Sequence, residues 1–365
     1  MPKTVLLLLF FISLLALHSG CQSVSDTEPS SLPQYTSNPS WLLGFNTPWN
    51  EFGRDFGNGI DNTRFWNKAY SEAAEMGLNA MRVWVHCDGR GSPHWNLDTG
   101  EPTKLPPGFE EDFQEMLDLA QRFGIAVMPC LWSFDLVVDR VAEEGPYAGV
   151  HERFVTEPKL VKSYIDNILI PLVKRFDDHP ALYAWEICNE PEWMVEDHGL
   201  DKEAVIRFIG LQAAALQRIA QKPVTNGAAS IKFNAEPPFG EDNWWSDASL
   251  QAATGDPDAS LDFYQIHAYG WMMPQGFEPY SRSYDEIGFD KPVMIGEAPA
   301  IGMTPPENSD LKPISASEMI SLARKNGYFG HFFWSFSGHD GVGGRKEIRN
   351  ATAKAAREDP SILPR

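Results

Sequence analysis

The chain has 365 residues, of which 43% are hydrophobic and 12% aromatic, and a formal net charge of −20. This hydrophobic content is ordinary for a globular protein, and the length fits either two average domains or one α/β barrel. The strong negative charge repels polyanions, so nucleic acids and anionic membrane surfaces are poor partners, whereas a neutral polymer is indifferent to it.

Residues 1–20 have the pattern of an export signal. Lys3 precedes an apolar run over residues 5–17, which is too short for a comfortable membrane span and has the length of a signal-peptide core. Two small residues then precede Cys21, which resembles the site at which a bacterial lipoprotein is cleaved and lipidated. Leu17 stands one position earlier than that pattern expects, so ordinary secretion is the alternative.

Residues 21–40 are rich in Ser, Thr and Pro and lack apolar periodicity, which predicts a flexible tether. Residues 41–358 contain no further linker, and residues 41–365 are expected to form one catalytic domain. We therefore expect a monomeric protein that is secreted or displayed at the cell surface, attached to an outer membrane if Cys21 carries a lipid.

From residue 41 onward, short apolar runs alternate with longer amphipathic segments, which is typical of repeated βα units. The predicted strands are residues 42–46, 80–86, 125–132, 182–188, 223–226, 261–267, 293–297 and 330–335. The predicted helices are residues 62–76, 109–123, 158–176, 203–220, 316–325 and 346–358. Eight such units in sequence close most naturally into a (β/α)8 TIM barrel. Long connections follow the strands, so we expect a built-up catalytic face.

Two glutamates mark the ends of two predicted strands. Glu190 lies in Trp-Glu-Ile-Cys-Asn-Glu-Pro, directly after residues 182–188, and Glu297 ends residues 293–297. Strand ends of a parallel barrel meet on one face, so both carboxylates are expected at the same rim. Cleavage of a glycosidic bond uses such a pair, because one carboxyl group protonates the leaving oxygen and the other attacks the anomeric carbon.

Other strand ends carry a matching set of side chains, namely Arg82, His267, Tyr269 and Trp334. With Asn-Glu-Pro after strand four and Ile-Gly-Glu at the end of strand seven, the chain resembles glycoside hydrolase family 5, in the retaining clan A. The resemblance covers roughly residues 41–344 and therefore does not rest on the two glutamates alone.

The resemblance implies roles for each of these positions. Glu190 is implied as acid/base and Glu297 as nucleophile of a double displacement. Substrate binding is implied for Arg82, Asn189, His267, Tyr269 and Trp334, with Asn189 on the sugar 2-hydroxyl and Trp334 under the −1 sugar. Crowding by a second carboxylate is expected to raise the pKa of one glutamate, while Arg82 and Tyr269 keep the other ionised.

Glu186 lies four residues before Glu190 on the same strand and therefore faces the same way, deeper in the barrel. A structural polar partner is the expected role of Glu186.

The strand-two and strand-four motifs are most similar to the mannanase-type members of the family. Strand three ends in Leu-Trp-Ser, where cellulase-like members usually carry a His, and Trp132 of this segment is expected to contact substrate. Further Trp residues near the predicted catalytic loops offer flat faces for sugar rings: Trp49, Trp95, Trp193, Trp244, Trp245 and Trp271.

These features predict an endo-acting hydrolase of mannan or glucomannan. A β-glucanase or cellulase, or an exo-acting β-glycosidase of the same clan, is the alternative. A non-catalytic surface protein that binds glycans is a more remote one, since such a barrel normally loses one of the two carboxylates.

No cofactor or metal is expected. Cys87, Cys130 and Cys188 each follow or end a strand-like run, which favours buried thiols over a disulfide. Paired Cys spacing and a His-x-His at a strand end are both missing from the sequence.

Overall fold

The computed structural model describes residues 32–138, 147–307 and 309–364. The predicted signal peptide, Cys21 and the first part of the predicted tether lie outside these residues. Within the described part of the chain, no helix is both long enough and apolar enough to cross a bilayer.

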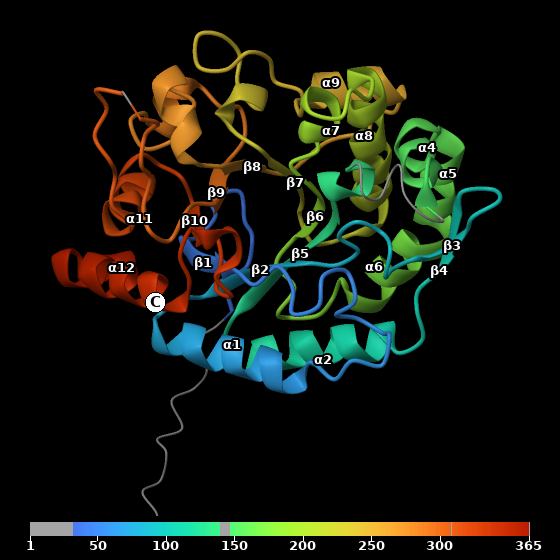
Figure 1. Ribbon diagram of the computed structural model, residues 1–365, viewed down its shortest axis with the longest axis horizontal. Coiled ribbons are helices and arrows are strands. Elements are labelled where there is room, and N and C mark those ends of the chain that lie inside the picture. The colour runs from blue at the N-terminus through green and yellow to red at the C-terminus, as the bar shows by residue number, and fades with distance from the viewer. Residues whose placement is uncertain (1–31, 139–146, 308, 365) are drawn as a thin grey trace, which may run out of the picture.

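Eight parallel strands close into a barrel in the order β1, β2, β5, β6, β7, β8, β9, β10, which confirms the predicted (β/α)8 fold (Figure 1). The strands are β1 Leu42–Asn46, β2 Ala80–Trp84, β5 Ala126–Ser133, β6 Trp185–Asn189, β7 Val224–Ala228, β8 Tyr264–His267, β9 Val293–Glu297 and β10 Gly330–Phe333. All their residues are buried, because helices cover the outside of the barrel and side chains fill its inside.

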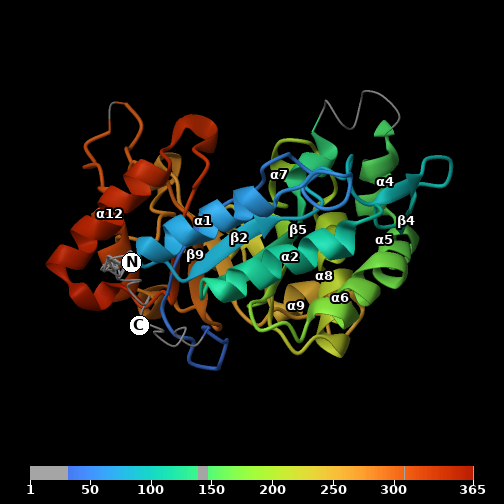
Figure 2. The same cartoon turned by 90° about the horizontal axis from the view of Figure 1, so that it is seen from below.

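Helices surround the barrel, and α1 and α2 lie side by side along it (Figure 2). They are α1 Thr63–Glu75, α2 Phe109–Arg122, α4 Val150–Thr156, α5 Pro158–Tyr164, α6 Ile170–Phe176, α7 Trp193–Glu196, α8 Lys202–Ile219, α9 Asp247–Thr254, α10 Tyr284–Ile287, α11 Ala316–Lys325 and α12 Arg345–Glu358. The helix predicted over residues 158–176 contains a π-helical turn, η3 Ile165–Leu169, between α5 and α6. Pro171 has no N–H for an α-helical bond to residue 167, and a wider turn accommodates its ring.

A short antiparallel hairpin lies within the connection from β2 to α2, which the sequence predicted as loop. It consists of β3 His94–Asn96 and β4 Glu101–Lys104. Its few residues are mostly exposed and lack an apolar alternation that would have marked them as strands.

Tyr35 packs against the N-terminal end of the barrel, inside the segment predicted as a tether. Its ring contacts Tyr183, Phe263 and Phe329 at centroid distances of 6.3, 5.3 and 6.3 Å. The Tyr35 hydroxyl donates a hydrogen bond to the carbonyl of Asp262 at 2.9 Å. The folded unit therefore begins before residue 41, because this ring covers apolar side chains at the bottom of the barrel.

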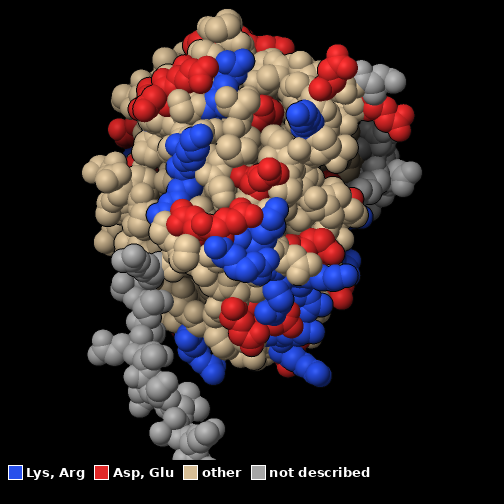
Figure 3. Space-filling view, turned by 90° about the vertical axis from the view of Figure 1, so that its left-hand side faces the viewer, with Lys and Arg blue, Asp and Glu red and all other residues tan. Residues whose placement is uncertain are grey.

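The face formed by α11 and α12 carries Lys and Arg side chains intermixed with acidic ones (Figure 3). Arg345 lies 3.3 Å from Glu72, and Arg349 lies 3.6 Å from Glu75. Exposed pairs of this kind contribute little to stability. They do mean that the basic groups of this face are largely compensated by neighbouring acids.

Candidate active site

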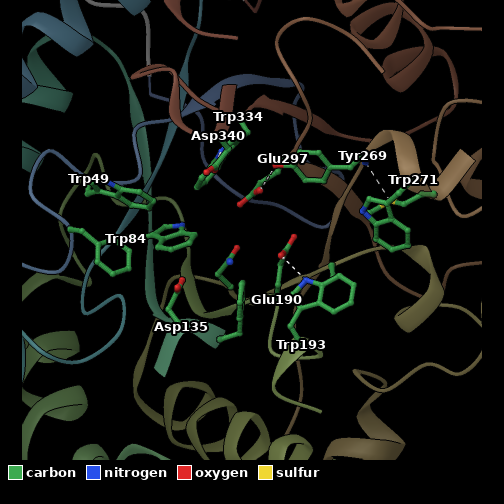
Figure 4. A pocket seen from close by; sticks show the side chains of 15 residues that line it. Trp49, Trp84, Asp135, Glu190, Trp193, Tyr269, Trp271, Glu297, Trp334 and Asp340 are labelled. Carbon is green, nitrogen blue, oxygen red and sulfur yellow. Dashed lines mark hydrogen bonds between the residues drawn. The ribbon is translucent and has the colours of Figure 1, made fainter. Parts of the chain in front are cut away.

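A cavity of about 620 Å³ opens at the C-terminal ends of the barrel strands (Figure 4). Glu190 and Glu297 lie at its centre, where their side chains approach from β6 and β9. One oxygen of each carboxylate and one ring nitrogen of His267 all lie within 4.8 Å of one another. Two carboxyl groups about 5–5.5 Å apart suit a retaining glycosidase, whereas an inverting one needs roughly 6.5–9.5 Å.

Glu190 is the first residue after β6, and its backbone adopts a left-handed conformation with φ of 45°. This conformation is unfavourable for a residue with a Cβ and occurs mainly where the surrounding structure enforces it. Glu190 Oε1 lies 2.6 Å from His267 Nδ1, and Oε2 accepts a hydrogen bond from the indole Nε1 of Trp193 at 2.8 Å. Both oxygens are therefore held in defined positions.

Glu297 ends β9, and each of its oxygens also has a partner. Oε1 accepts a hydrogen bond from Arg82 Nη1 at 2.6 Å, and Oε2 accepts one from the Tyr269 hydroxyl at 2.7 Å. Both donors stabilise the ionised form, which is the form needed for nucleophilic attack.

Arg82 is fully buried beneath this pair and links both sides of the barrel. Its Nε and Nη2 donate to the two oxygens of Glu186 at 2.7 and 2.6 Å. It also donates to the side-chain oxygens of Asn46 at 2.9 Å and Asn189 at 2.8 Å. Glu186 thus has the structural role predicted for it, as the buried counter-ion of Arg82.

Burial raises the pKa of Glu190 to about 7, and the negative charges of Asp135 and Asp340 add to the rise. The indole N–H of Trp193 opposes it. A carboxyl group with this pKa is partly protonated near neutral pH and can donate a proton to a leaving group.

Burial also raises the pKa of Glu297 above its ordinary value, and the Glu190 charge adds to the rise. His267, Arg82 and the Tyr269 hydroxyl oppose it. Burial is the largest cause for both glutamates, and the predicted effect of a second carboxylate contributes less, through the Glu190 charge on Glu297. Burial lowers the pKa of His267 to about 4, so its ring is neutral at pH 7.

Aromatic side chains form walls on either side of the two carboxyl groups (Figure 4). Trp49, Trp84 and Trp334 form one cluster, with centroid distances of 5.1 Å from Trp49 to Trp84 and 5.6 Å from Trp84 to Trp334. Trp193 and Trp271 lie on the other side, 5.9 Å apart. Flat faces on both sides of a scission point can stack on sugar rings on both sides of the bond.

Trp132 lies outside this cavity, which corrects the prediction that it contacts substrate. Its side chain is fully buried, packs 4.7 Å from His86 and 4.8 Å from Tyr164, and donates Nε1–H to Gln212 at 3.1 Å. The end of β5 turns the indole outward into the core between barrel and helices. Among the other predicted Trp residues, Trp49, Trp193 and Trp271 line the cavity, whereas Trp95, Trp244 and Trp245 do not.

Several cavity residues were missed as candidates, namely Trp84, Asp135, Trp193 as a partner of Glu190, and Asp340. Asp340 accepts a hydrogen bond from Trp334 Nε1 at 2.8 Å and so fixes the tilt of that indole. Its backbone has a positive φ of 60°, and the glycine-rich stretch around it is the only signal in the sequence that marks this loop. Trp84 stands only two residues after Arg82 in the sequence, so it was visible beside a predicted site residue.

Among the described residues, only Glu190, His267 and Glu297 come together as a set that could ligate a metal ion. Their oxygens already accept hydrogen bonds from Trp193, Arg82 and Tyr269. The guanidinium of Arg82 also brings a positive charge to within 2.6 Å of Glu297. This donor set suits an acid and a nucleophile better than a cation.

The three cysteines of the barrel are buried free thiols, in agreement with the sequence interpretation. Burial raises the pKa of each of them well above the ordinary thiol value, so they are inert.

No protein-family model matches the chain. Over 356 residues it is 26% identical to the mannan endo-1,4-beta-mannosidase of Mytilus edulis, an alignment that covers 90% of this chain and 92% of that protein. The corresponding enzyme of Cryptopygus antarcticus is 26% identical and covers 83% of this chain, with 82% of its own length aligned.

Solved structures agree with these sequence matches. The beta-mannanase of Mytilus edulis superposes with a TM-score of 0.76 at 24% identity and covers 91% of this chain and 98% of its own. The beta-1,4-mannanase of Aplysia kurodai gives a TM-score of 0.74 at 25% identity, with 91% and 98% covered. By sequence the chain is thus similar to mannan endo-1,4-beta-mannosidases, and its fold is that of the solved mannanases, which agrees with the resemblance seen in its strand-end motifs.

Proposed function

We propose that the chain is a retaining endo-β-1,4-mannanase, with Glu190 as acid/base and Glu297 as nucleophile. The observation that carries the proposal is the pair of carboxylates within 4.8 Å at the rim of a barrel that is related to mannanases over 90% of its length. The aromatic walls on both sides of the pair favour cleavage inside a polymer over removal of terminal sugars.

In the first step, Glu297 attacks the anomeric carbon while Glu190 protonates the leaving oxygen. Arg82 and Tyr269 hold the attacking carboxylate in its ionised form and fix its direction. The pKa of Glu190, about 7, provides a proton near neutral pH. In the second step Glu190, now ionised, accepts a proton from the water that releases the sugar from Glu297.

The substrate is tested with a panel of mannan, glucomannan, cellulose derivatives, mixed-linkage glucan, xylan and β-1,3-glucan. Release of internal fragments and new reducing ends from mannan or glucomannan is expected, with Glu297→Gln as the inactive control. Turnover of the other glycans without either mannan substrate would reject the assignment. Single sugars as first products would indicate exo action, and binding to mannan without hydrolysis would indicate a glycan-binding protein.

The stereochemistry is tested by proton NMR of the product formed first. The β-anomer should appear before mutarotation mixes the anomers. An α-anomer as first product would contradict double displacement.

We also propose that the chain is exported as a monomeric lipoprotein with its lipid on Cys21. The apolar run over residues 5–17 and the small residues before Cys21 support this proposal. Radioactive fatty acid should label the wild-type protein and leave Cys21→Ser unlabelled, and light scattering should give the mass of one processed chain, which is below the 40.9 kDa of the full sequence because residues 1–20 are removed. Equal labelling of both proteins would contradict lipidation, and a doubled mass would contradict the monomer.

A further inference from the structure

Glu192 is a buried carboxyl group next to the active site that the proposed reaction does not use. Its side chain is 0% exposed. Oε1 accepts a hydrogen bond from the indole Nε1 of Trp245 at 2.5 Å, and Oε2 accepts one from the backbone N–H of Ala229 at 3.1 Å. A carboxyl group is rarely fully buried without hydrogen-bond partners, because its desolvation is costly.

These two bonds connect the turn after β6 to the segment after β7. Ala229 follows β7 directly and lines the cavity. The turn has a second attachment near the end of β7, because Glu190 N–H donates to the carbonyl of Gly227, within that strand, at 2.6 Å. The turn that carries Glu190 is therefore fixed to residues 227–229 at two points.

This turn requires such support. Glu190 holds a left-handed φ of 45°, which relaxes unless neighbouring contacts enforce it. Trp193, the residue after Glu192, donates its backbone N–H to the Glu190 carbonyl at 3.1 Å and its indole N–H to Glu190 Oε2 at 2.8 Å. A shift of Glu192 therefore moves both the backbone of Glu190 and a hydrogen-bond donor to its carboxyl group.

We propose that Glu192 is a positioning residue for the acid/base, which it serves by tying the Glu190–Trp193 turn to Ala229 and Trp245. The inference rests on the proposed function of Glu190. Burial raises the pKa of Glu192 to about 8, and its two N–H donors oppose this rise. The N–H groups of Trp245 and Ala229 each donate to a different oxygen of the Glu192 carboxyl group. A glutamine at this position has only one side-chain oxygen, so its NH2 group would face one of these two N–H donors.

The test compares Glu192→Gln with Glu196→Gln as a matched control. Glu196 lies at the end of α7, has 37% side-chain exposure and pairs with Lys232 at 3.0 Å, so its replacement makes the same change from carboxyl to amide without altering the hydrogen bonds of the turn. Trp245→Phe removes one donor and leaves the carboxyl group in place, so it carries the test if Glu192→Gln does not fold. Thermal unfolding confirms that each variant is folded.

Each variant is assayed on mannan and on a dinitrophenyl β-mannobioside with azide, a substrate and nucleophile that need neither acid nor base assistance. Glu192→Gln should lower kcat on mannan by about 10–100-fold and on the activated glycoside by less than about 3-fold. Trp245→Phe should act in the same direction, and Glu196→Gln should stay within about 2-fold of wild type on both.

If Glu192→Gln lowers kcat equally on both substrates, or on neither, the positioning role is overturned. The wild type remains active in that case, so the proposed function itself still stands. An inactive wild type would instead reject the proposed function itself, so the two failures are distinguishable.

Discussion

Replacement of Arg82 by Lys perturbs the connection between the two sides of the barrel interior. The guanidinium makes five hydrogen bonds to side-chain oxygens of Glu186, Glu297, Asn46 and Asn189, at distances of 2.6–2.9 Å. A lysine ammonium has three donors that diverge from one atom and cannot span both carboxylates in this geometry. At least one of the two buried negative charges then loses its partner.

Breaking a buried ion pair costs about 3–5 kcal/mol. For an ordered part of roughly 320 residues the unfolding entropy is about 0.7 kcal/mol per kelvin, so Tm should fall by about 4–7 °C. Loss of a charge-assisted donor to the attacking carboxylate should also lower kcat on mannan by about 100–1,000-fold. Scanning calorimetry and initial rates on mannan measure the two effects.

Arg218→Lys provides the matched control on the surface. Arg218 is half exposed and also binds two carboxylates, Asp256 at 2.5 Å and Asp258 at 2.8 Å. An exposed pair contributes about 0–1 kcal/mol, so this variant should keep its activity and lose at most about 1–2 °C. If Arg82→Lys matches Arg218→Lys in both Tm and kcat, the argument that Arg82 orients Glu297 is refuted.

Three further predictions follow from the site. Glu190→Gln should block cleavage of mannan but partly spare activated aryl glycosides, whereas Glu297→Gln should abolish both; equal rates for the two variants on an aryl glycoside would contradict the assigned roles. The folded pKa of Glu190, about 7, exceeds its ordinary value of 4.5, so its neutral form contributes stability that is present below pH 4.5 and lost as pH rises through about 7. Between pH 5 and 8, the Tm of Glu190→Gln should therefore fall less than the Tm of the wild type. Parallel curves of Tm against pH for the two proteins would argue against the raised pKa. Trp132→Phe should lower Tm, since Gln212 loses its indole donor, and leave KM for mannan unchanged; a raised KM would place Trp132 back at the substrate.

The barrel and its two carboxylates were predictable because they depend on local signals. Buried parallel strands give continuous apolar runs, and each run ended in a residue whose chemistry was visible in the sequence. Glu190 and Glu297 follow such runs, so their common rim required only the parallel topology. The exact strand bounds were less certain: β6 begins at Trp185, whereas Leu182 forms only an isolated bridge to Val127.

Features that depend on contacts between distant loops were not predictable. The direction of the Trp132 indole is set at the end of β5. Successive side chains of a strand point to opposite faces, so a shift of one residue decides whether this indole points into the cavity or into the core. Asp340 and Trp193 act through hydrogen bonds to Trp334 and Glu190, and their positions come from loop conformations without a sequence period. Tyr35 was missed because its neighbours read as a polar tether, while its own ring finds apolar partners more than 140 residues away.

The docking of Tyr35 fixes the end of the barrel at which the described chain begins. The chain joins the barrel at the N-terminal ends of the strands, and the two carboxylates lie at the opposite ends. The first described residues therefore lie at the floor of the barrel, away from the catalytic loops. Were Cys21 fixed to a membrane, the chain would enter the barrel at the end away from the cleft, which would leave the cleft open to long glycan strands.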